Sequence, residues 1–224
     1  MKPFAQWTVE EVEETFQISA RFESPRLQAW MTGCAAPAPE ESSQLAQLQR
    51  KLLRHGYDWN EQELIVYFIG PLLTLVDFDQ EQYHPFLERE LVVEFEQDRL
   101  AGVVDFLVAQ GKHSPKHPYF VIHEYKKEHD SSNDPLGQVL IAMVAAQKLN
   151  HDGNPMYGAY VLGRYWHFVL LDGDAYTVHP GLNAATPDDL RVIFGTLQQT
   201  KTLIDACIAS RLAQNPVGAK HPGE

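Results

Sequence analysis

Three ionisable side chains stand where the sequence is otherwise apolar. Asp105 interrupts the run AGVVDFLVA at 101–109, and Glu124 and Lys126 end the run PYFVIHEYKK at 118–127. A carboxylate inside a buried strand is costly unless it is paired or bound to a metal. Two carboxylates offer the hard oxygen ligands that Mg²⁺ or Mn²⁺ takes in proteins. The three side chains therefore predict a divalent-cation site with an amine beside it.

Such a site suits the hydrolysis of a phosphodiester. This reaction needs neutralised charge on the phosphate, an activated water and a stabilised leaving oxygen. Strand alternation predicts that Phe120, Ile122, Glu124 and Lys126 share one face. The Lys126 amine would then point to the same spot as the Glu124 carboxylate, where it could orient the water or stabilise developing negative charge.

The elements around these residues are predicted from residue patterns. The β-branched, apolar run 101–109 is typical of a buried central strand, and 118–127 predicts the next strand. A strand over 87–96 should precede them, with a turn at 99–102 and a polar loop over 111–117.

Helices are expected before the strands. A capping box at 8–11 begins a short helix to about Phe16, and a second helix is expected near 25–31. Leucines at helical spacing predict a helix over 44–55. The small, polar, proline-containing residues 33–43 predict a linker.

A further helix should begin near Trp59, with Glu61 on its apolar stripe and a break or kink at Pro71. Asp134 and Pro135 have the residue types of an N-cap and first helical position, so a helix should begin there and run to about residue 149. The remaining expected elements are strands at 157–164 and 166–171 and a helix over 186–212. This order predicts an α/β fold with a mixed central sheet.

The chemical residues also resemble a known family, the PD-(D/E)XK nuclease superfamily. The match consists of Val104-Asp105, eighteen intervening residues and then Glu124-Tyr125-Lys126, with Val104 where the family has proline. The resemblance implies a restriction-endonuclease-like α/β/α core with added N-terminal and C-terminal helices. It also implies a metal-dependent nuclease in which the Tyr125 backbone carbonyl adds an oxygen to the metal site.

Two further site residues follow from the resemblance. The family often has an acid on the helix before the sheet, and Glu61 matches it better than its competitor Glu63. As implied by the family, Glu61 would be a metal ligand or base, and Gln138 would orient the site from the next helix. Structural interpretations stay open: an ion pair of Asp105 with Lys126, a helix N-terminal acid at Glu61, and an ordinary first-turn residue at Gln138.

A longer stretch, 61–166, is similar to bacterial proteins that resemble the N-terminal nuclease domain of type I restriction motor subunits. The shared features are ELxxxFIxPLL, GVVDF, EYKK, DPxGQ and YGxYVxGRxWxF. The resemblance implies nucleic acid cleavage, with DNA as the expected substrate, in a defence or repair context. The chain would then divide into an N-terminal helical segment and linker (1–43), a nuclease-like domain (44–214) and a flexible tail (215–224).

Composition limits the partners. The chain has 224 residues, 44% of them apolar, and a net charge of −12. Nucleic-acid binders usually present basic surface, so the charge argues against tight binding by this chain alone, although not against cleavage. No apolar run reaches membrane-span length, no secretory signal is visible, and the two cysteines lie far apart. We therefore expect a cytoplasmic protein without a membrane partner.

The sequence is also compatible with other functions. The main one is a catalytically inactive nuclease-fold module for binding or assembly. Another is a hydrolase or assembly partner that uses its acidic surface to dock a basic protein. The sequence also leaves open a homodimer or protein partner, DNA against RNA, and single against double strands.

Overall fold

The computed structural model describes residues 2–33, 35–95, 98–128 and 134–214. These form one eight-stranded sheet in the order β1-β7-β6-β5-β4-β3-β2, with β8 paired to β6. The pairs β4–β5 and β1–β7 are parallel and the others are antiparallel. The expected α/β class with a mixed sheet is confirmed. The strands are β1 (Ser19–Ala20), β2 (His84–Phe95), β3 (Asp98–Gln110), β4 (Lys116–Lys126), β5 (Met156–Leu162), β6 (Tyr165–Asp172), β7 (Ala175–Val178) and β8 (Leu182–Asn183).

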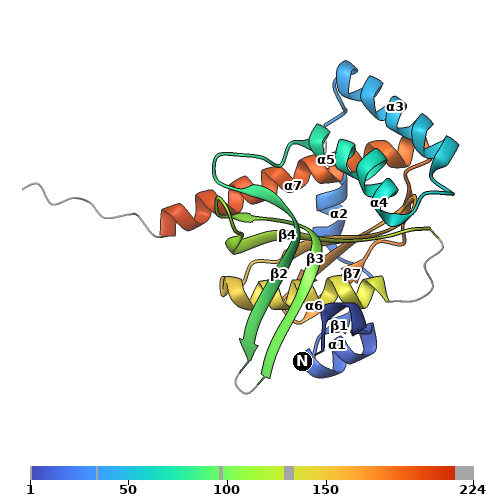
Figure 1. The fold of residues 1–224 in the computed structure, drawn as a ribbon. Coiled ribbons are helices and arrows are strands. Elements are labelled where there is room, and N and C mark those ends of the chain that lie inside the picture. Colours follow the sequence, from blue (N-terminus) through green and yellow to red (C-terminus); the bar gives the residue numbers. More distant parts are fainter. Residues whose placement is uncertain (1, 34, 96–97, 129–133, 215–224) are drawn as a thin grey trace, which may run out of the picture.

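Helices cover both faces of this sheet (Figure 1). One hydrophobic cluster lies between the sheet and α1 with α6, and a second lies between the sheet and the other helices. Among the described helices, none combines the length and the apolar character needed to cross a bilayer. The helical elements are η1 (Phe4–Gln6), α1 (Val9–Phe16), α2 (Pro25–Thr32), α3 (Pro39–His55), α4 (Glu61–Leu64), η2 (Ile65–Ile69), α5 (Gly70–Val76), α6 (Pro135–Asn150) and α7 (Pro187–Gln214).

The expected helix starts at Thr8 and Asp134 are confirmed, and one carboxylate joins them. Asp134 Oδ1 accepts a hydrogen bond from Gly137 N at 3.0 Å, which caps α6. Its Oδ2 accepts from Val9 N in the first turn of α1 at 2.8 Å. A Cβ atom at Gly137 would lie 2.5 Å from the Trp7 carbonyl oxygen, so the N-terminal segment can pack this closely only against glycine.

The linker predicted over 33–43 is wrong in its second half. Helix α3 begins at Pro39, and Ala38 N donates to the Glu41 carboxylate at 2.7 Å. Proline is suited to a first helical position because the N–H it lacks would have no partner there. Cys34 and the expected tail at 215–224 lie outside the described residues.

The helix that carries Glu61 continues past Pro71 through a local change of pitch. Residues 65–69 form a π-helical segment, in which Gly70 N donates to Ile65 O, and α5 follows with the proline in its first turn. A π-turn loosens the usual hydrogen-bond ladder, which accommodates a residue without an N–H. The expected interruption at Pro71 is therefore an irregular turn and not an end of the helix.

The turn predicted over 99–102 is wrong. Strands β2 and β3 pair continuously in this region, and their register extends to Phe95↔Asp98. Gly102 lies inside β3, where the Phe4 ring would collide with any Cβ atom, 2.1 Å from its Cγ. The packing of Phe4 against β3 therefore explains why a glycine stands at this position of the strand, although the local sequence predicts a turn.

A bulge in β4 places Phe120 on the opposite side of the sheet from the expected one. Val108 pairs with Val121 while Ala109 pairs with Tyr119, so Phe120 is an extra residue in the strand. Phe120 belongs to the cluster on the α7 side of the sheet, whereas Ile122 belongs to the cluster on the α6 side. The prediction that Phe120 shares a face with Ile122 is therefore wrong.

Candidate functional site

Four ionic side chains from three elements meet at the end of β4. The Lys126 Nζ atom lies 2.7 Å from Glu124 Oε1, 3.7 Å from Glu61 Oε2 and 3.9 Å from Asp105 Oδ2. The Lys126 and Glu124 side chains are only 11% and 9% exposed. We call these four residues the carboxylate–lysine cluster.

Strand pairing positions two of the carboxylates. Phe106 on β3 pairs with His123 on β4, and Asp105 and Glu124 are the next residues along the two antiparallel strands. The Asp105 Oδ2 atom accepts a hydrogen bond from Tyr125 N at 2.7 Å, which ties the carboxylate to the β4 backbone. The same peptide segment presents its carbonyl to the cluster, since Lys126 Nζ donates to Tyr125 O at 3.0 Å.

The N-terminus of α4 distinguishes Glu61 from its competitor Glu63. Asn60 N donates to the Glu63 carboxylate at 2.9 Å, and Glu63 N donates to Asn60 Oδ1 at 3.0 Å, which is a capping box. The Glu63 carboxylate is thus engaged at the helix end. Glu61 is the acid that reaches Lys126.

Burial and mutual repulsion perturb the acids of the cluster. Burial and the neighbouring Asp105 raise the pKa of Glu124 to about 7, against the opposing pull of Lys126. Burial also raises the pKa of Asp105, although the Tyr125 N–H and Lys126 lower it. Burial would lower the pKa of Lys126, but the three carboxylates outweigh it and raise that pKa. Three acids share one amine, so the cluster has more carboxylate groups than nearby cations.

Gln138 lies in the first turn of α6, as expected, and is 3% exposed. Its Nε2 atom is buried and has no hydrogen-bond partner among the described residues. The structure therefore does not join this amide nitrogen to the cluster directly. A buried amide donor without a partner is costly, so a group that accepts its hydrogen bond would stabilise the folded protein.

The cluster offers oxygen donors that suit a divalent cation, but the Lys126 amine lies among them. Among the described residues, no three His, Cys, Asp or Glu side chains are already arranged as a metal site. Instead, the Lys126 ammonium lies within 4 Å of all three carboxylates, and a fourth oxygen, the Tyr125 carbonyl, also faces it. Carboxylate and carbonyl oxygens are the ligand types of Mg²⁺ and Mn²⁺. The residue types therefore match those that bind such an ion. For an ion to bind, the Lys126 amine would have to move out of the space between the three carboxylates.

Sequence reasoning missed one acid near this site. Glu88 has φ +47°, and its neighbours on β2 pair with the two residues that flank Asp105 on β3. The exposed Glu88 carboxylate contributes to the raised pKa of Asp105. Only the hairpin register identifies this residue, because nothing in the pattern of 87–96 distinguishes it from the other acids there.

A neutral histidine lies behind the cluster. His123 is fully buried, stacks on Phe106 at 5.1 Å between ring centroids, and its Nδ1 lies 3.0 Å from Tyr125 Oη. Burial lowers the pKa of His123 to about 3, so the ring is uncharged near neutral pH. This histidine is a core residue and does not add charge to the site.

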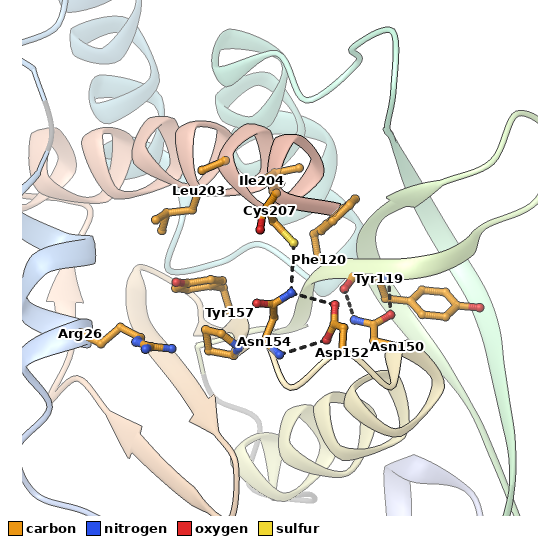
Figure 2. A pocket seen from close by; sticks show the side chains of 13 residues that line it. Arg26, Tyr119, Phe120, Asn150, Asp152, Asn154, Tyr157, Leu203, Ile204 and Cys207 are labelled. Atoms are coloured by element: carbon orange, nitrogen blue, oxygen red, sulfur yellow. Dashed lines mark hydrogen bonds between the residues drawn. The ribbon is translucent and has the colours of Figure 1, made fainter. Parts of the chain in front are cut away.

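A hollow of about 270 Å³ lies away from the cluster, near the start of β4, between α7 and the segment that follows α6 (Figure 2). Among its described lining residues, Cys207 carries a thiol, which accepts a hydrogen bond from Asn154 Nδ2 at 3.4 Å. Burial raises the pKa of that thiol, which disfavours the reactive thiolate. Asp152 is paired with Arg211. The described lining of this hollow therefore offers no activated nucleophile, and the carboxylate–lysine cluster is the better candidate for chemistry.

Comparison with known proteins adds no assignment, since neither a family model nor a curated protein matches this chain. The resemblance in the motifs around Asp105 and Glu124 stays a prediction.

Proposed function

We propose that this protein is a divalent-metal-dependent nuclease that hydrolyses phosphodiester bonds in nucleic acid, with DNA as the expected substrate. One observation carries the proposal: Glu61, Asp105 and Glu124 converge on Lys126 Nζ from one helix and two strands. Structural ion pairs rarely need three acids for one amine, and burying surplus carboxylates destabilises a fold. A cation at this position would offset that cost.

The residues that would hold Mg²⁺ or Mn²⁺ are Asp105, Glu124, the Tyr125 carbonyl and Glu61. When bound, the ion would neutralise phosphate charge and make a water more acidic. Asp105 is already oriented by the Tyr125 N–H, so its position needs little reorganisation.

Lys126 would act on the substrate directly. Its ammonium lies in the cluster and is mostly shielded from solvent, where a positive charge interacts more strongly with an anionic phosphate than in bulk water. It would orient the attacking water and stabilise the negative charge that develops on the phosphoryl oxygens. Gln138 would support the site by donating from the Nε2 atom that has no partner among the described residues.

A catalytically inactive nuclease-fold module is the second candidate. It is favoured by the short Lys126–Glu124 pair, which balances part of the charge without a metal, and by the net charge of −12. In this case the cluster would be a structural ion-pair network.

Cleavage of supercoiled plasmid and of single-stranded DNA, each with Mg²⁺ or Mn²⁺, separates the two candidates. We expect metal-dependent cleavage that Lys126→Ala lowers by at least about 100-fold, as removal of a transition-state donor does in other enzymes. Lys127→Ala is the matched control, because Lys127 is the exposed neighbour on the chain. Equal activity of the Lys126→Ala and wild-type proteins would refute the assignment.

A second pair of variants tests the acid on α4. Glu61→Gln should lower cleavage, whereas Glu63→Gln should leave it unchanged, since glutamine can also serve in a capping box. Equal effects of the two substitutions would show that the approach of Glu61 to Lys126 has no catalytic role.

A further inference from the structure

A basic, aromatic groove lies between α3 and the chain around Trp59 and Tyr67. We call it the α3 groove; its volume is about 520 Å³, and its lining residues are Gln47, Arg50, Lys51, Arg54, His55, Trp59 and Tyr67. None of these side chains is acidic. In a chain with a net charge of −12, a groove lined by three permanent cations is an unusual concentration of positive charge.

The acidic side chains that the structure describes do not neutralise the cations of the groove. Arg50, Lys51 and Arg54 are exposed, and none of them forms a salt bridge within the part of the chain that the structure describes. The C-terminal end of α3 favours a basic residue in its last turn, which accounts for Arg54. It does not account for the other two, which lie earlier on the helix.

Aromatic rings form the other wall of the groove. Tyr67 is 45% exposed, and its ring centroid lies 5.8 Å from that of the half-buried Trp59. Lys51 Nζ lies 5.8 Å from the Tyr67 ring centroid, within range of a cation–π contact. An exposed ring with a cation beside it is the arrangement on which proteins stack unpaired bases.

A short stretch of chain connects the α3 groove to the carboxylate–lysine cluster. Trp59 precedes Glu61 by two residues, so their Cα atoms are at most about 7 Å apart. Glu61 Oε2 lies 3.7 Å from Lys126 Nζ. A polymer seated in the groove would therefore pass close to the proposed site of cleavage.

We propose that the α3 groove binds single-stranded nucleic acid, with backbone phosphates on Arg50, Lys51 and Arg54 and a base stacked on Tyr67. The choice of a nucleic acid rests on the proposed function. The choice of a single strand rests on the ring, because a paired and stacked base in a duplex does not expose its face to a side chain.

Fluorescence anisotropy with a labelled oligothymidylate tests this inference. The titration is made in EDTA, so that cleavage plays no part. Tyr67→Ala should weaken binding by roughly 5- to 150-fold, the loss expected for one stacked base. Tyr67→Phe, which keeps the ring, should bind like wild type. Unchanged binding by the alanine variant would overturn the stacking contact.

The phosphate contacts are tested by salt dependence. Each lost contact to a single strand lowers the slope of log K against log salt by about 0.7, so Lys51→Ala/Arg54→Ala should lower it by about 1.4. Lys112→Ala/Lys116→Ala is the matched control, because it removes the same charge from two exposed positions outside the groove. Lys112 lies in the loop between β3 and β4, and Lys116 is the first residue of β4. Equal losses in the two double variants would mean that only net charge matters, which would overturn the site.

The same titration separates this inference from the proposed nuclease. Groove-dependent binding in EDTA without cleavage in Mg²⁺ or Mn²⁺ would support the groove and refute the nuclease. Metal-dependent cleavage, together with unchanged binding by the groove variants, would support the nuclease and refute the groove. Tighter binding of a duplex of matching length, or of an acidic peptide, than of the single strand would overturn the inference.

Discussion

The buried Glu124 carboxyl predicts a pH dependence of folding stability that one substitution should remove. Its pKa is about 7 in the folded protein and 4.5 when unperturbed, with burial as the largest cause. A carboxyl with a raised folded-state pKa opposes folding when it is ionised, so its penalty is nearly absent at pH 4.5, develops as the pH rises, and is complete above pH 7. A tenfold difference in proton affinity corresponds to about 1.4 kcal/mol, so the penalty at pH 8 is on the order of 3 kcal/mol.

Urea unfolding of wild type and Glu124→Gln at pH 4.5 and pH 8, both in EDTA, measures this penalty. The glutamine is neutral at both pH values, so its stability relative to wild type should rise by about 3 kcal/mol between them. Glu63→Gln, which makes the same change at the N-terminal cap of α4, is the matched control. If Glu124→Gln has the same effect on stability at both pH values, the carboxyl is not held in the perturbed environment described here.

Three further outcomes are expected. The affinity for Mn²⁺ in calorimetric titration should rise from pH 6 to pH 8, because the Glu124 carboxyl, with its pKa of about 7, must lose its proton to bind a cation. Gly137→Ala should lower the free energy of unfolding by about 1–3 kcal/mol in urea, because its Cβ would press against the Trp7 carbonyl. The pKa of His123 is about 3 in the folded protein, below its ordinary 6.5. As the pH falls below 6.5, the imidazole is therefore protonated in the unfolded state before it is protonated in the folded state, and the folded protein loses stability. Acid unfolding of His123→Phe should therefore begin at a lower pH than that of wild type.

Much of the site could be predicted because strand alternation and charge are local signals. The strands that carry Asp105, Glu124 and Lys126 are where the apolar runs indicated, and antiparallel pairing brings the two runs together. The sequence favours Glu61 over Glu63 only by its place on the apolar stripe, because both acids lie in the first turn of the same helix. The capping box at Asn60 distinguishes them, and that is a matter of side-chain geometry.

Two of the three errors arise from contacts between distant segments. Gly102 belongs in a turn by local preference, but it lies within a strand because the Phe4 ring packs where a side chain would be. The bulge at Phe120 reverses the expected face of one residue, and it is visible only from the pairing with β3. Pro39 begins a helix in a segment whose composition is typical of a linker.

The most direct test of the central claim is calorimetric titration of Mn²⁺ into the wild-type protein, Asp105→Asn and Lys127→Ala at pH 8. If three carboxylates gather around Lys126 in order to hold a cation, wild type and Lys127→Ala will bind Mn²⁺ saturably and Asp105→Asn will not. Absence of saturable binding to wild type, or equal binding to Asp105→Asn, would contradict the account.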